Sequence, residues 1–132
     1  MENKALDYYK SGFNCAQSIL KACNEDLKLT DNENELLKAA MGLGTGMFVG
    51  ETCGAVTGAI MALSLKLGSS QAADRENMRK VFKQIKIFEK TFKEKNCSMN
   101  CKELKTVYKI DCEKVIKDSA EQVKKQISEL EV

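Results

Sequence analysis

The 132-residue chain contains no histidine, no tryptophan and no proline. Without histidine it cannot form a Ser-His-Asp or Cys-His catalytic site, a metal site with two histidine ligands or a histidine-ligated haem. Without proline, helices can follow one another along the chain with no built-in breaker. The absence of histidine therefore limits the possible catalytic and metal sites, and the absence of proline points to a helical architecture.

The chain also lacks a large excess of positive or negative charge, and it lacks long apolar runs. The formal net charge is only +2, so the composition indicates neither a nucleic-acid nor a membrane partner. No apolar run of about 18 residues is present, and the opening MENKALDYYK lacks the charged, apolar and cleavage regions of a secretory signal. We expect a single domain over residues 1–132, located in the cytoplasm.

Apolar residues recur at helical spacing along the chain, and no segment alternates as a strand would. We predict an all-α, compact bundle of about five to seven helices. The longest is predicted over residues 70–95, where one apolar stripe comprises Met78, Val81, Phe82, Ile85, Phe88 and Phe92. Asn14 with Gln17 predicts a helix start through a capping box. Thr30 with Glu33 repeats that pattern.

Six cysteines are many for a chain with no export signal. In a reducing compartment they indicate metal ligation or redox chemistry rather than a disulfide framework. Four of them follow a residue of the helix-capping type: Asn14-Cys15, Thr52-Cys53, Asn100-Cys101 and Asp111-Cys112. Each is predicted at the first position of a helix, where unpaired N–H groups and the helix dipole lower the pKa of a thiol. Helix N-termini repel one another unless negative charge lies between them, so we predict that at least three of these sulfurs converge in one pocket.

Other interpretations of the cysteines remain. The four could be inert core residues, because free cysteine is often buried. A zinc site has less support, since closely spaced cysteine pairs do not occur twice, and a Cys-x-x-Cys motif is absent. Cys23 falls on the apolar stripe of its helix and is interpreted as a small buried hydrophobe outside the pocket. Cys97 is predicted in a turn. There it could be a spare ligand, a resolving thiol or a residue without a role.

Glycines recur every four residues from Gly42 to Gly58, with one more at Gly44. At Gly54 and Gly58 they favour close helix packing. From Gly42 to Gly50, close packing and a backbone whose N–H groups surround an anion or a cluster are equally favoured. The candidate cofactor-binding residues are Gly44, Gly46, Gly50 and Gly54. No Gly-Lys-Ser/Thr sequence follows and no strand precedes, so we expect no nucleotide site.

Four segments, FNCAQSIL, GETCGAVTGAIMALSLKLG, NCKEL and DCEKVIKDSAEQV, resemble the redox-active proteins named for the C_GCAxxG_C_C motif. The Cys-Gly-Ala-x-x-Gly element occupies residues 53–58. The resemblance implies an all-helical domain typical of anaerobic prokaryotes, with redox-active or iron–sulfur-ligating thiols at Cys15, Cys53, Cys101 and Cys112. Cys23 and Cys97 are additions to the family pattern.

The leading hypothesis is an accessory redox protein that binds an iron–sulfur cluster through these four cysteines and exchanges electrons with a redox partner protein. The alternative is a metal-free thiol–disulfide enzyme whose redox-active thiols are Cys53 and Cys15. Cys53 would be the attacking thiol, because the glycine-rich approach should leave it accessible. A third hypothesis is an inert helical interaction module. Formation of a homodimer is left open by the sequence. A weakly basic docking face over residues 79–109 for an acidic redox partner is left open too.

Overall fold

The computed structural model describes residues 1–130, and the predicted all-α bundle is confirmed. Its elements, in chain order, are α1 (Glu2–Lys10), α2 (Cys15–Leu27), α3 (Glu33–Ala40), the short turns η1 (Met41–Leu43) and η2 (Gly46–Gly50), α4 (Gly54–Leu67), α5 (Arg75–Asn96), α6 (Cys101–Thr106) and α7 (Cys112–Leu130). Within residues 1–130 there is no strand, and pairing of the β type is limited to a single bridge between Thr52 and Asn100.

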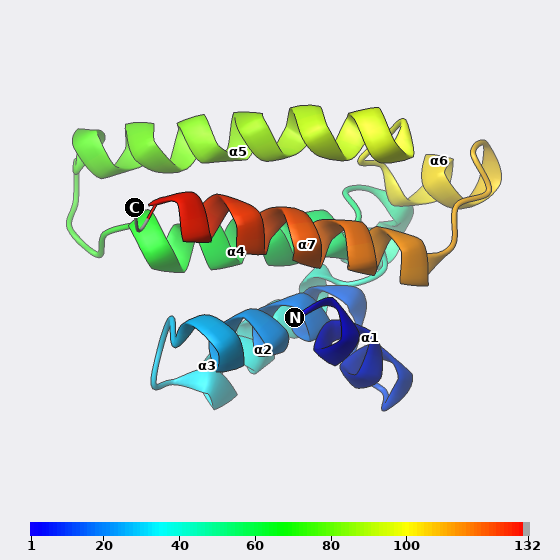
Figure 1. Cartoon of the computed structure of the whole chain (residues 1–132), viewed down its shortest axis with the longest axis horizontal. Helices are drawn as coiled ribbons and strands as arrows, with labels where there is room; N and C mark the ends of the chain where they lie inside the picture. Colours follow the sequence, from blue (N-terminus) through cyan, green and yellow to red (C-terminus); the bar gives the residue numbers. More distant parts are fainter. Residues whose placement is uncertain (131–132) are drawn as a thin grey trace.

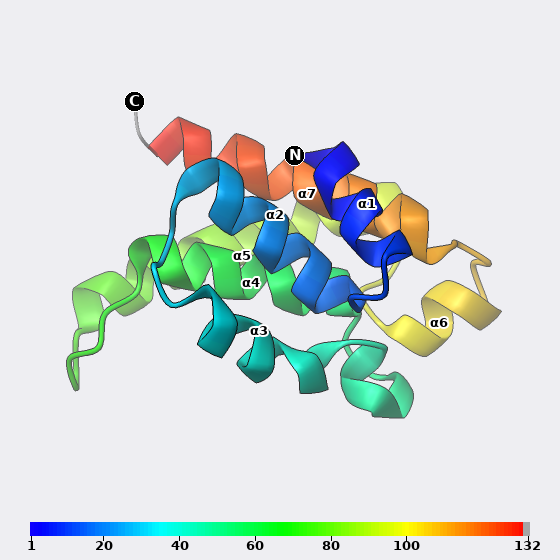
Figure 2. The same cartoon turned by 90° about the horizontal axis from the view of Figure 1, so that it is seen from below.

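The helices form three tiers (Figure 1). α5 runs along one side, α4 and α7 lie in the middle, and α1 to α3 cover the other side. Seen from below, α2 crosses beneath α4 and α7, and the glycine-rich segment with η2 lies beside α6 (Figure 2). This arrangement gathers the starts of α2, α4, α6 and α7 at one end of the bundle.

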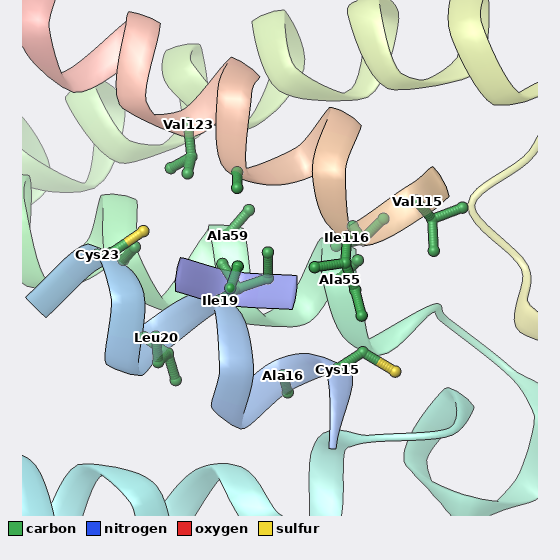
Figure 3. Close-up of a cluster of buried hydrophobic side chains, with 14 of the residues drawn as sticks. Cys15, Ala16, Ile19, Leu20, Cys23, Ala55, Ala59, Val115, Ile116 and Val123 are labelled. Atoms are coloured by element: carbon green, nitrogen blue, oxygen red, sulfur yellow. The ribbon is translucent and has the colours of Figure 1, made fainter. Parts of the chain in front are cut away.

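The core lies where α2, α4 and α7 meet (Figure 3). Its members include Ile19 and Leu20 of α2 and Ile116 of α7, all fully buried. Small residues on α4 let α2 approach closely, because a Cβ atom added to Gly58 would lie 2.8 Å from the carbonyl oxygen of Ala16. The packing interpretation of Gly58 is therefore confirmed.

One of the two predicted capping boxes is present. The Asn14 side chain accepts from the Gln17 N–H at 3.0 Å, and the Gln17 side chain accepts from the Asn14 N–H at 3.2 Å. The box predicted at Thr30 and Glu33 is wrong, because α3 starts after Asn32. The Glu33 carboxylate instead binds Lys21 and Asn24, so it does not reach back to the Thr30 backbone.

The long helix starts later than predicted. Asp74 caps α5 by accepting from the Asn77 N–H at 3.1 Å, so residues 70–74 belong to the preceding loop. The apolar stripe of α5 is also only partly buried. Phe88 is in the core, whereas Met78 and Phe82 are more than 60% exposed, at 62% and 61%.

None of the helices over residues 1–130 combines the length and the apolar character that crossing a bilayer requires.

Candidate redox site

Four cysteines that are distant in sequence line one small cavity where α2, α4, α6 and α7 begin. We call this cavity the cysteine pocket; it is lined by Cys15, Cys53, Cys101, Leu104, Lys105, Ile110, Cys112 and Val115. Its free volume is about 10 Å³, the space of about one water molecule. The predicted convergence of at least three sulfurs in one pocket is confirmed.

Backbone pairing brings Cys53 and Cys101 together. The Cys53 N–H donates to the carbonyl of Met99 at 2.7 Å, and the Cys101 N–H donates to the carbonyl of Glu51 at 2.5 Å. Asn100 then caps α6 by accepting from the Glu103 N–H at 2.9 Å. Two helix starts are thus held side by side by main-chain hydrogen bonds, which depend little on side-chain identity.

Cys15 and Cys112 form a hydrogen-bonded pair across the starts of α2 and α7. The hydrogen bond from the Cys15 thiol lowers the pKa of Cys112 to about 5, with the Tyr9 hydroxyl and the positive charge of Lys105 as further causes. The same interaction, together with burial, raises the pKa of Cys15. The pair therefore holds a proton on Cys15 and a thiolate at Cys112.

Cys53 lies one position earlier than predicted. It is the N-cap residue of α4, and Thr52 instead forms the bridge with Asn100. The Cys53 sulfur accepts hydrogen bonds from the N–H groups of Ala55 and Val56. Burial nevertheless dominates and raises the pKa of Cys53 to about 11. The expected lowering of the thiol pKa holds in direction for Cys112, where the hydrogen bond from Cys15 is its largest cause. The expectation is wrong for Cys15, whose pKa is raised by the hydrogen bond with Cys112 and by burial. It is also wrong for Cys53, because desolvation of the buried thiolate outweighs the helix start.

The glycine-rich segment lies behind the sulfurs and does not line the cavity. The Thr45 N–H donates to the Cys15 sulfur, and Thr45 has a left-handed backbone with φ of 50°. Gly46, with φ of 63°, packs so closely that an added Cβ would lie 2.7 Å from the Cβ of Cys101. An added Cβ on Gly54 would lie 3.1 Å from the Cys15 sulfur. Cofactor binding by Gly44, Gly46, Gly50 and Gly54 stays a prediction.

Among the four cysteines that line the pocket, the accessible thiol is Cys112. Cys15, Cys53 and Cys101 are buried, whereas Cys112 is half-buried. An open hollow of about 470 Å³ reaches it, lined also by Tyr9, Lys105, Lys109, Ile110, Asp111 and Glu113. The expectation that Cys53 would be the accessible thiol is therefore wrong, because Cys53 is buried at the start of α4 and only 4% exposed.

The other two cysteines lie away from the pocket lining. Cys23 is fully buried at the far end of α2 from Cys15, as expected (Figure 3). Its thiol faces the Met1 sulfur at 3.6 Å, and burial raises its pKa to about 12. Cys97 is exposed and ends α5 in a left-handed conformation with φ of 72°.

Three residues that contact the sulfurs escaped the sequence analysis. They are Tyr9, Thr45 and Lys105, which act through a hydroxyl, a backbone N–H and a charge. Neither a lone tyrosine on an amphipathic helix nor a backbone N–H group forms a recognisable sequence motif, so Tyr9 and Thr45 could not be found from the sequence. Lys105 lies four residues after the signature cysteine Cys101 on α6, and this spacing is the signal that could have drawn attention to it.

A comparison with protein-family models finds one match, over residues 13–126, to the family described as "Putative redox-active protein (C_GCAxxG_C_C)". The chain belongs to this family. The C_GCAxxG_C_C region contains all four pocket cysteines, the helices from α2 to α6, and α7 as far as residue 126. Tyr9 therefore lies outside the matched region. No curated protein and no solved structure matches the chain.

Proposed function

We propose that the cysteine pocket binds an iron–sulfur cluster and that the chain is an electron-transfer or accessory redox protein. The observation that carries this proposal is the convergence of four thiols from four helix starts on one cavity, Cys15, Cys53, Cys101 and Cys112. A dithiol reaction uses two sulfurs and leaves two without a role. Four cysteine thiolates are the usual ligand set of [2Fe–2S] and [4Fe–4S] clusters.

The residues fit such a cluster in ligand type and number. Backbone N–H groups of Thr45, Ala55 and Val56 already donate to two of the four sulfurs, and such donors tune the potential of a cluster. The free volume is about 10 Å³, and among residues 1–130 no group of three or more histidine, cysteine or acidic residues is arranged to hold a metal ion. Cluster binding therefore requires the pocket to widen.

A bound cluster would supply a one-electron couple, and the protein would supply its surroundings. Leu104, Ile110 and Val115 would exclude water from the sulfurs. Lys105 would offset part of the negative charge of the thiolates. The pairing of residues 51–53 with residues 99–101 would fix the relative positions of two ligands.

Anaerobic reconstitution with ferrous iron and sulfide tests the proposal. Iron, sulfide and visible absorbance are measured per chain in the wild type and in Cys15→Ser, Cys53→Ser, Cys101→Ser and Cys112→Ser. Each of these variants should lose most of its iron, whereas the matched controls Cys23→Ala and Cys97→Ser should retain it. Colourless, iron-free wild-type protein would exclude the proposal.

A second candidate function rests on the hydrogen-bonded pair of Cys15 and Cys112. The Cys112 thiolate would attack one sulfur of a disulfide substrate, forming a mixed disulfide and releasing the first thiolate of the substrate. Cys15 would then pass its proton to that thiolate and attack the Cys112 sulfur. The products are a Cys15–Cys112 disulfide, one substrate thiol and one substrate thiolate, so two electrons pass from the pair to the substrate.

Reduction of a small aromatic disulfide, followed by absorbance of the released thiol, separates the two functions. A dithiol reaction should be lost in Cys112→Ser and Cys15→Ser and persist in Cys53→Ser and Cys101→Ser. Equal loss in all four variants, together with loss of bound iron, would support the cluster and contradict the dithiol mechanism.

A further inference from the structure

The bundle carries an exposed apolar groove at the end opposite the cysteine pocket. It is a hollow of about 360 Å³ between the end of α4, the loop that follows it and the first three turns of α5. Its apolar wall consists of Met78, Val81, Phe82 and Ile85. We call this hollow the α5 groove. Figure 1 shows the start of α5 beside the end of α4, at the other end of the molecule from α6.

The groove continues across α4. A second hollow of about 240 Å³, lined by Leu36, Met61, Ser64 and Leu65, shares Ser64 with the first one. Two apolar hollows that share a lining residue can accept two apolar anchor side chains of an amphipathic helix. Methionine at both hollows adapts readily to different anchors.

A basic stripe runs along the exposed side of the groove. Arg75, Arg79, Lys83, Lys86 and Lys90 follow one another at spacings of three and four residues, so they share one face of α5. Among residues 1–130 no acidic group lies within ion-pair distance of any of them, and Lys86 instead lies over the ring of Phe82 at 5.1 Å. By contrast, Lys80, which lies off this stripe, pairs with Glu76, and Lys93, which extends the stripe by three residues, pairs with Glu89.

The polar end of the groove is already satisfied. Asp74 accepts from the backbone and the side chain of Asn77, and it also binds Ser69. Recognition is therefore left to the apolar wall and the basic stripe.

We propose that the α5 groove docks an amphipathic, acidic helix of a partner protein, with apolar anchors in the hollows and carboxylates along the basic stripe. Charge complementarity selects this occupant. A second copy that apposed the same face would bring two basic stripes together, which opposes association. A concave site between two helices also suits protruding side chains better than a flat lipid surface. Docking here leaves the cysteine pocket free, and the proposal is independent of which redox chemistry that pocket performs.

Titration of the isotopically labelled full chain, followed by NMR, tests the docking site. The probe is a synthetic helical peptide with leucine and phenylalanine at helical spacing and glutamate elsewhere, and its control carries lysine in place of glutamate. Binding of the acidic peptide should shift resonances around residues 61–87 and weaken as salt rises. Arg79→Glu/Lys83→Glu and Phe82→Ser should each weaken it tenfold or more. Lys80→Glu/Lys117→Glu, with the same charge change off the stripe, should bind like the wild type.

Four outcomes would overturn the proposal. The first two are no binding of the acidic peptide and equal binding of the basic one. The third is a dimer in sedimentation velocity that Phe82→Ser dissociates, which would assign the groove to a second copy. The last is co-sedimentation with anionic phospholipid vesicles that Arg79→Glu/Lys83→Glu abolishes, without peptide binding, which would assign it to a membrane surface.

Discussion

At the end of the bundle where α2, α4, α6 and α7 begin, Cys15, Cys53 and Cys101 are buried among apolar side chains. At the end where α5 begins, Met78 and Phe82 point into solvent. The first end thus excludes water from groups whose chemistry needs burial, and the second leaves apolar surface uncovered. Apolar periodicity does not distinguish the two ends, because burial depends on whether a neighbouring helix covers the stripe.

The largest contrast in stability is expected between two phenylalanines of α5. Phe88 is 1% exposed and stacks on Phe92 with ring centroids 5.7 Å apart, so Phe88→Ala should cost about 3–5 kcal/mol through lost burial and a cavity. Phe82 is exposed, so Phe82→Ala should change the free energy of unfolding by about 0.5 kcal/mol or less. Urea denaturation measures both, and equal losses would show that the groove is part of the core.

A second contrast lies within the glycine-rich segment. An added Cβ on Gly46 would lie 2.7 Å from both the Cβ of Cys101 and the backbone nitrogen of Glu51, and its φ is 63°. Gly46→Ala should therefore destabilise the protein by about 1–3 kcal/mol and displace Cys101. Nothing lies within 4 Å of a Cβ on Gly42, so Gly42→Ala should be close to neutral. Thermal unfolding compares the two, and a neutral Gly46→Ala would contradict the close packing.

Helix caps give a smaller contrast. Asn14 caps α2 at the cysteine pocket through a complete capping box and also donates to the carbonyl of Met41 at 2.8 Å. Asn14→Ala should cost about 1 kcal/mol. Asn32 precedes α3 without a side-chain cap bond, so Asn32→Ala should cost clearly less. Chemical denaturation of the two variants tests the difference, which vanishes if the box contributes nothing.

The finest contrast is in thiol reactivity. With its pKa lowered to about 5, Cys112 is a thiolate at neutral pH, so its alkylation rate should rise with pH through that value and be level by pH 7. Tyr9→Phe removes a donor to the thiolate and should shift this profile to higher pH, whereas Tyr108→Phe, an exposed tyrosine, should not. Iodoacetamide labelling with mass spectrometry measures the profiles. A Cys112 rate still rising at pH 9 would contradict the assigned thiolate.

The sequence by itself determined the helical class and the identity of the clustered cysteines. Both rest on local physics: apolar spacing, the absence of proline, and capping residues such as Asn14, Asn100 and Asp111 that act within one turn. The convergence of the sulfurs was also predictable, because helix starts assemble only around negative charge.

Tertiary structure decided which thiol is reactive and which apolar residues are buried. Local rules predicted a lowered pKa for each cysteine at a helix start, yet burial raises the pKa of Cys53 while Tyr9, Lys105 and Cys15 lower that of Cys112. Glu33 binds Lys21 of another helix, which removed the capping box predicted at Thr30. Met78 and Phe82 have the same spacing as Phe88, but their exposure depends on where α4 and α7 end beside α5. Desolvation of a thiol, ion pairs between helices and the covering of an apolar stripe by a neighbouring helix arise only when helices pack. No local sequence pattern can therefore predict them.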